Sequence, residues 1–182
     1  SERLFGWPNA LFPTGFSGLY KIEVAKYRSG EMQVVSGAMG KERVHYEAPE
    51  ASRVEAEMTA FLSWFNATSN IDPVIKAAIA HFRFVTIHPF DDGNGRIARA
   101  ITDMQLSRGD GTSQRFYSMS NQILAERKRY YEILEKTQHG DSDITEWIEW
   151  FLSCLERALI GSTEVLKSVL AKAEFWETHK QT

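Results

Sequence analysis

The hydrophobic positions of this chain follow two different spacings, first that of short strands and then that of helices. Residues 32–37 and 43–46 are short β-favouring runs with a glycine-containing turn between them, which predicts a small hairpin over residues 32–46. From Pro49 onward, apolar residues recur every three or four positions, as on one face of a helix. The first such stripe consists of Val54, Met58, Phe61, Leu62 and Phe65. Residues 1–31 are rich in glycine, proline and aromatic residues and predict irregular structure around a short helix.

Start and stop signals divide the rest of the chain into further helices. Asp72-Pro73 predicts a helix start, and that helix runs from residue 74 to about residue 87 because Pro89 disfavours helical geometry at His88. Further helices are expected near residues 94–109, 121–138, 147–160 and 163–179, the third of these after a capping segment at residues 142–146. In the helix at 121–138, the residues expected to point inward are Ile123, Leu124, Tyr130, Tyr131 and Leu134.

These elements predict a single all-α domain, a helical bundle with a small β-hairpin. Its parts are an N-terminal irregular segment at residues 1–31, the hairpin at 32–46, a helical core at 49–160 and a C-terminal helix at 161–182.

Composition excludes several classes of function. The 182 residues are 43% hydrophobic and 25% charged, which is ordinary for a soluble globular domain. With a net charge of −3 and no basic face, the chain offers nothing for nucleic acid. Cys154 is its only cysteine, so a disulfide framework and a cysteine zinc site are both excluded. Neither a membrane span nor a signal-peptide pattern is present, and we expect a cytoplasmic domain.

The most informative stretch is His88-Pro-Phe-Asp-Asp-Gly-Asn-Gly-Arg-Ile-Ala-Arg99. Its loop leads into the N-terminus of a helix, where free N–H groups and the helix dipole favour an anion. Glycines at 93 and 95 allow close approach, and Asn94 can add a side-chain amide. Arg96 and Arg99 lie three residues apart and share a helix face, so both can reach phosphates. The pattern therefore predicts a site for a di- or triphosphate.

Two further residues of this stretch suggest chemistry at the phosphate site. Asp92 lies at its mouth, and one carboxylate facing a polyphosphate is a typical protein contribution to Mg²⁺ binding. His88 has an ordinary pKa suited to removing a proton from a hydroxyl near neutral pH.

Two metal sites are alternative interpretations of residues in and near this stretch. A calcium loop counted from Asp91 would need a glutamate where Thr102 stands. His81 lies seven residues before His88, which makes a two-histidine metal site conceivable. No third ligand lies nearby, and a core histidine with satisfied hydrogen bonds is the better interpretation of His81.

The twelve-residue stretch resembles the Fic (filamentation induced by cyclic AMP) motif, H-x-F-x-D/E-G-N-G-R-x-x-R, at every fixed position. The hairpin at 32–46 resembles the Fic target-docking flap, and residues 80–84 resemble the helix that leads into the motif. Residues 130–131 and 138–141 resemble a downstream helix and turn. Residues 11–20 are similar to a bacterial subgroup with extra N- and C-terminal segments.

The resemblance implies transfer of AMP from ATP to a Ser, Thr or Tyr hydroxyl of a target protein, in the presence of Mg²⁺. His88 would be the general base, Asp92 would hold the metal, and Phe90 would be a buried structural anchor. The implied nucleotide-binding residues are Gly93, Asn94 and Gly95 as the anion hole, Arg96 and Arg99 at the inner and γ-phosphates, and Tyr131, with Tyr130 and Gln138, at adenine. The implied docking residues of the flap are Val34, Val35, Val44, His45 and Tyr46, which would pair with an extended target segment.

Branches of the same superfamily with related activities differ from this sequence at fixed positions of the motif. The kinase-like branch has lysine in place of Gly95, and phosphocholine-transferring branches tend to lack the glycine found here at position 93. Keeping both glycines favours AMP as the transferred group, with another nucleotide or phosphate-containing group as the alternative. A catalytically silent nucleotide-binding regulatory module is the competing class of function, but a mere scaffold has no need for the base His88. Removal of AMP ranks low.

An inhibitory helix of the type S/T-x-x-x-E-G/N, common among Fic proteins, has no match in this chain. Ser142 and Glu146 come nearest, but Trp147 follows them. We expect the chain to be a fragment whose inhibitory helix lay upstream, or the glutamate to come from a second subunit or an antitoxin. The target and the oligomeric state stay open.

Overall fold

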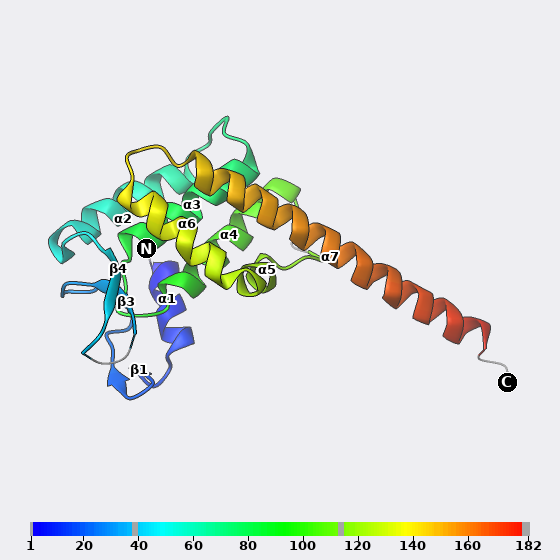
Figure 1. The fold of residues 1–182 in the computed structure, drawn as a ribbon, viewed down its shortest axis with the longest axis horizontal. Coiled ribbons are helices and arrows are strands. Elements are labelled where there is room, and N and C mark those ends of the chain that lie inside the picture. Colours follow the sequence, from blue (N-terminus) through cyan, green and yellow to red (C-terminus); the bar gives the residue numbers. More distant parts are fainter. Residues whose placement is uncertain (1, 38–39, 113–114, 180–182) are drawn as a thin grey trace.

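The computed structural model describes residues 2–37, 40–112 and 115–179 as a helical bundle with two small hairpins (Figure 1). It confirms the predicted all-α class and the hairpin, which is called the flap below. The N-terminal part holds α1 (Glu2–Leu11), β1 (Phe16–Ser17), β2 (Tyr20–Lys21), β3 (Gln33–Ser36) and β4 (Arg43–Glu47). The remaining elements are α2 (Ala51–Asn66), α3 (Pro73–Ile87), α4 (Asn94–Asp110), α5 (Met119–Ala125), α6 (Arg127–His139) and α7 (Thr145–Thr178).

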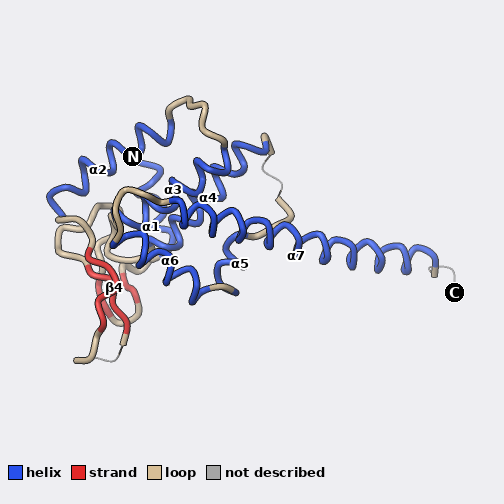
Figure 2. Tube along the Cα trace, turned by 45° about the horizontal axis from the view of Figure 1, so that its top comes forward, coloured by secondary structure: helices blue, strands red, loops and turns tan. Residues whose placement is uncertain are grey.

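Helices α3 and α4 lie along each other at the centre of the bundle (Figures 1 and 2). The Asp72 carboxylate accepts hydrogen bonds from the N–H groups of Val74 (2.8 Å) and Ile75 (3.2 Å), which confirms the predicted start of α3. At the far ends of the pair, a Cβ built on Gly109 would lie 2.5 Å from Cβ of Pro73. The two helices therefore run antiparallel in close contact, and the motif forms the connection at their other end.

The core is dominated by aromatic side chains that fasten α2 and α7 onto this central pair. Trp147 of α7 is fully buried, and its Nε1–H donates to the Ala78 carbonyl of α3 at 2.9 Å. On the α2 side, Phe61 contacts Phe84 of α3 with ring centroids 5.9 Å apart. The largest fully buried side chains include Trp147, Phe61, Phe84, Phe90, Phe151 and Met58.

The single helix predicted at 121–138 is wrong, because the chain leaves helical geometry at Glu126 (φ −105°, ψ 24°). The Glu126 carboxylate accepts two hydrogen bonds from the Arg157 guanidinium of α7, at 2.7 and 2.6 Å. The break separates the apolar stripes of α5 and α6, so two residues expected inside are exposed: Leu124 by 67% and Tyr131 by 49%. Ile123, Tyr130 and Leu134 are buried as predicted.

The two helices predicted at 147–160 and 163–179 are one helix, α7, which corrects that expectation. The Oγ of Ser162 and the Oγ1 of Thr163 donate to the Leu159 carbonyl, so these residues bond within the helix rather than ending it. The second half of α7 projects from the bundle (Figure 1). It carries exposed Val165, Leu166, Val169, Leu170, Phe175 and Trp176. None of the described helices is long and apolar enough to cross a membrane.

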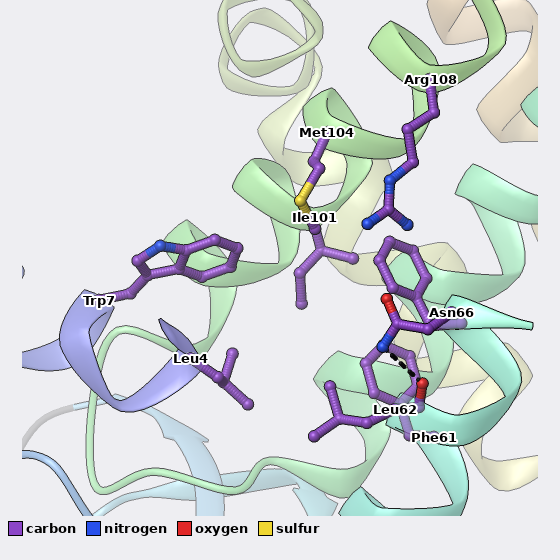
Figure 3. A pocket seen from close by; sticks show the side chains of 9 residues that line it. Leu4, Trp7, Phe61, Leu62, Asn66, Ile101, Met104 and Arg108 are labelled. Atoms are coloured by element: carbon purple, nitrogen blue, oxygen red, sulfur yellow. Dashed lines mark hydrogen bonds between the residues drawn. The ribbon is translucent and has the colours of Figure 1, made fainter. Parts of the chain in front are cut away.

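An apolar hollow of about 180 Å³ opens between α1, α2 and α4 (Figure 3). Leu4 and Trp7 of α1 face Ile101 and Met104 of α4 across it, and Arg108 lies at one side. None of the residues that the sequence assigned to the site lines this hollow.

The contact between Gly109 and Pro73 generates a stability prediction. Gly109→Ala places a methyl group 2.5 Å from the Pro73 ring, and we expect it to cost about 1–3 kcal/mol of unfolding free energy. Gly161→Ala in α7 is the matched control, since no atom lies within 4 Å of its new methyl group. It should stabilise by about 0.5–1 kcal/mol, because alanine favours helix. Denaturant unfolding measures both; a Gly109→Ala protein as stable as the parent contradicts the close packing of α3 on α4.

Candidate active site

The connection between α3 and α4 turns at His88, which adopts the left-handed conformation (φ 50°, ψ 58°). Its N–H donates to the Phe84 carbonyl at 3.1 Å and closes α3. Nδ1 of the ring lies 3.1 Å from the Val85 carbonyl, which can only accept, so Nδ1 carries the proton. Nε2 is then the nitrogen that can accept a proton from a substrate.

The electrostatic surroundings of His88 favour the neutral ring. Burial is the largest cause and lowers its pKa below the ordinary 6.5. The Val85 hydrogen bond and the Asp92 carboxylate raise the pKa, and the Arg28 guanidinium lowers it, but the net shift is downward. The imidazole therefore stays unprotonated near neutral pH, as a general base requires.

The turn at residues 88–93, called the motif turn below, is braced from inside by Asn94. Its Nδ2 donates to the Phe90 carbonyl (2.7 Å) and its Oδ1 accepts from the Phe90 N–H (3.0 Å). Asn94 is 2% exposed, and in this structure both polar atoms of its side chain bond to the Phe90 backbone within the turn. Phe90 is fully buried against the rings of Phe5, Tyr27 and Phe84.

The start of α4 has the backbone that the sequence suggested for an anion site. Gly93 has a φ of 84°, which disfavours any side chain, and a Cβ there would lie 3.1 Å from the Phe12 ring and 3.2 Å from Leu11. In this structure the Gly93 N–H donates to the Asp92 carboxylate. Gly95 lies beside the Arg99 guanidinium, with 3.7 Å between the position of a Cβ and Nη1.

The two arginines of the motif differ in their surroundings. The Arg96 guanidinium lies over the Phe12 ring, 4.5 Å from its centroid, and 4.0 Å from Oδ2 of Asp92. Among the described residues, no carboxylate lies within ion-pair distance of Arg99. A cationic side chain without an acidic partner at the start of α4 suits an anionic ligand.

The N-terminal segment contributes residues that sequence reasoning missed. The Ser17 hydroxyl of the β1–β2 hairpin donates to the Asp92 carboxylate, and the Glu23 N–H donates to Asp91 at 2.9 Å. The Arg28 N–H donates to the Pro89 carbonyl and its Nε to the His88 carbonyl, at 2.9 and 2.8 Å. No short-range pattern reveals these contacts, because the partners are 60 to 75 residues apart.

The predicted adenine residues are spread over different environments. Tyr130 is 4% exposed and its hydroxyl lies 3.0 Å from Nε2 of His81, so it belongs to the core. Tyr131 is half exposed, and Gln138 donates to the Thr86 hydroxyl at 3.2 Å, near the end of α3. His81 is confirmed as a core histidine: it is fully buried, with Nδ1 2.9 Å from the Thr102 hydroxyl.

The flap presents some of its predicted docking residues and uses others as anchors. Val35 and Val44 pair across the hairpin and are each nearly half exposed, while Val34 pairs with Tyr46. Tyr46 is buried and its hydroxyl donates to the Thr86 carbonyl at 2.7 Å, so it attaches the flap to α3 instead of offering a docking surface. Nδ1 of His45 lies 2.7 Å from the Glu135 carboxylate of α6.

Comparison with known proteins agrees with this geometry. The Fic/DOC family profile matches residues 11–106, more than half of the chain, and the chain belongs to this family. A protein adenylyltransferase Fic of Nematostella vectensis is 31% identical over 151 residues, covering 80% of this chain and 31% of its own length. The relative from Culex quinquefasciatus with the same name is 35% identical over 104 residues, which are 56% of this chain and 19% of that protein.

Solved structures show the same architecture. A Fic family protein from Desulfovibrio desulfuricans G20 superposes with a TM-score of 0.72 at 28% identity, over 92% of this chain and 47% of that one. A Fic domain-containing signalling protein from Bacteroides thetaiotaomicron gives 0.68 at 23% identity, over 92% of this chain and 63% of that one. The chain thus spans about a third or less of the curated relatives it matches and about half of the first of these structures.

The environments of the buried His81 and the partly buried His88 predict different titrations. Burial lowers the pKa of His81 to about 3 and that of His88 below 6.5. A ¹³C-detected NMR titration should show His88 protonating below pH 6.5 and His81 staying neutral to about pH 3. Because the unfolded chain protonates His81 near 6.5, the free energy of unfolding should fall as pH drops from 6.5 towards 3. Titration of His81 near 6.5 contradicts its buried network.

Proposed function

We propose that this domain transfers AMP from ATP to a hydroxyl side chain of a target protein. The observation that carries the proposal is His88, a partly buried imidazole with its proton on Nδ1, at the start of the turn that leads into the N-terminus of α4. Curated relatives named protein adenylyltransferase Fic, at 31–35% identity, support the same reaction.

In the proposed reaction, the target hydroxyl oxygen attacks the α-phosphorus of ATP while Nε2 of His88 takes its proton. A P–O bond forms to the target, the bond to the β-phosphate breaks, and pyrophosphate leaves. The free N–H groups at the start of α4, with Arg96 and Arg99, would stabilise charge on the phosphates. Catalysis then rests on positioning and electrostatics rather than on covalent chemistry by the protein.

The residues present fit one Mg²⁺ ion bound together with the nucleotide. Among the described residues, no three His, Cys, Asp or Glu side chains cluster as a metal site would require. Asp92, with a half-exposed side chain beside Arg96, is a single carboxylate donor. This matches Mg²⁺ in nucleotide sites, where waters and phosphates supply most of the ligands. When bound, the ion would neutralise charge on the phosphates.

The surroundings of Arg99 support a site open to the γ-phosphate. Within the part of the chain that the structure describes, no glutamate pairs with this guanidinium. The proposal includes an inhibitory glutamate supplied in the cell from outside this sequence, by an upstream segment, a second subunit or an antitoxin. On this proposal, the described residues form a site that lacks the inhibitory glutamate.

The test is incubation of the domain with Mg²⁺, a lysate and ATP labelled at the α-phosphate. Label should appear on protein with the parent chain and be lost, by at least about 10²-fold, with His88→Ala, since a positioned general base contributes about 10²–10⁴-fold. Asp92→Asn should also lose transfer and should need more Mg²⁺ for half-maximal rate. His179→Ala is a control, because His179 is exposed at the end of α7, where its ring hydrogen-bonds to the Phe175 carbonyl of the same helix.

The competing outcomes are distinct. Label from γ-labelled ATP on protein would show a kinase activity instead. Tight ATP binding by calorimetry, with no label on any protein, would favour a nucleotide-binding regulatory module. Transfer that survives His88→Ala would contradict the role given to the imidazole.

A further inference from the structure

Arg28 is a buried cation whose hydrogen bonds go to backbone carbonyls. It is 3% exposed, and among the described residues it forms no salt bridge with a carboxylate. Nε donates to the His88 carbonyl at 2.8 Å, Nη1 to the Gly30 carbonyl at 2.8 Å, and Nη2 to the Pro49 carbonyl. Burying a charge is costly unless it is fully hydrogen-bonded, so the position of this guanidinium is closely determined.

The three carbonyls belong to two parts of the site. The carbonyl of His88 lies in the motif turn, where the Arg28 N–H also binds the neighbouring Pro89 carbonyl at 2.9 Å. Gly30 comes just before β3 and Pro49 just after β4, so they are the two roots of the flap. A hydrogen bond from Ala48 to Met32, 2.9 Å long, joins the roots. One guanidinium therefore connects both flap roots to the motif turn.

The conformation of His88 explains why such a connection is needed. A left-handed backbone is costly for a residue with a side chain, so it persists only where its surroundings hold it. The Nε–H of Arg28 binds the His88 carbonyl, and the His88 N–H binds the Phe84 carbonyl, so both backbone polar groups of His88 are held. The imidazole direction follows from this main-chain geometry.

We infer that Arg28 is a positioning residue for the transfer reaction, which holds His88 in its left-handed turn and keeps the flap in register with it. The inference rests on the proposed function. A target segment paired with the flap brings its hydroxyl to the imidazole only if the flap roots and the motif turn move together. A misplacement of about 1 Å in such an arrangement costs on the order of 10²-fold in rate.

Kinetics of two Arg28 variants test this role. Arg28→Lys keeps the charge but cannot bind three carbonyls, and Arg28→Gln removes the charge. Both should lower kcat for protein labelling on the order of 10²-fold. The Kd for ATP with Mg²⁺, by calorimetry, should stay within about twofold of the parent value, because the phosphate-binding residues lie on α4. Matched controls are Arg53→Lys and Arg53→Gln, at an exposed arginine of α2 whose ion-pair partner among the described residues is Glu57.

All rates are to be measured below the unfolding temperature of the least stable variant. If Arg28→Gln does not fold, Arg28→Lys alone decides. Parent-like kcat in a folded Arg28 variant overturns the inference, as does a loss of ATP affinity equal to the loss of kcat, which indicates general disruption of the site.

NMR separates failure of this inference from failure of the proposed function. In the parent protein, the Nε–H of Arg28 should exchange slowly with solvent, and the His88 ring resonances should shift in Arg28→Lys while those of His81 do not. Fast exchange of the Nε–H, or unchanged His88 resonances, overturns the positioning role even where transfer is observed. If the parent protein transfers no label but these signals behave as expected, the proposed reaction is wrong and the positioning of His88 stands.

Discussion

The left-handed turn at His88 is the constraint on which the rest of the site depends. It ends α3, sends the chain through Pro89 and Phe90, and returns it as α4, so one backbone conformation places both the imidazole and the helix N-terminus. Because this conformation is costly for a residue with a side chain, the surroundings must stabilise it. Within the turn and α4, the Asn94 side chain and the buried Phe90 ring stabilise it, and Arg28 of the N-terminal segment binds the His88 carbonyl.

The N-terminal segment completes the site in the same way. The Phe12 ring lies under the Arg96 guanidinium, and a side chain at Gly93 would be crowded by the same ring. The Ser17 hydroxyl donates a hydrogen bond to the Asp92 carboxylate. A cation bound at Asp92 must share that carboxylate with Ser17 and the Gly93 N–H or replace them. The twelve-residue motif therefore carries the proposed reactive groups, and residues 12–28 contact it and help to fix its conformation.

Local signals in the sequence predicted the central elements well. Asp72-Pro73 and Pro89 bound α3 because capping and proline sterics act over a few residues, and the flap follows from two β-favouring runs around a turn. Prediction failed at two places in the C-terminal half. The break at Glu126 is held by Arg157 from another helix. The two helices predicted at 147–160 and 163–179 are one, because Ser162 and Thr163 bond to the Leu159 carbonyl within α7.

The sequence by itself determined the family and the helical class and predicted the chemistry of the site, because the motif places a histidine, a carboxylate, two glycines and two arginines in one turn and the helix start that follows it. Only the tertiary structure decided what each polar group is free to do. The side-chain amide of Asn94 hydrogen-bonds to the Phe90 backbone, Tyr46 and Tyr130 are buried, and Arg28 joins the flap to His88. The physical reason is that burial and hydrogen-bond partners arise from segments far apart in the chain, which no local pattern encodes.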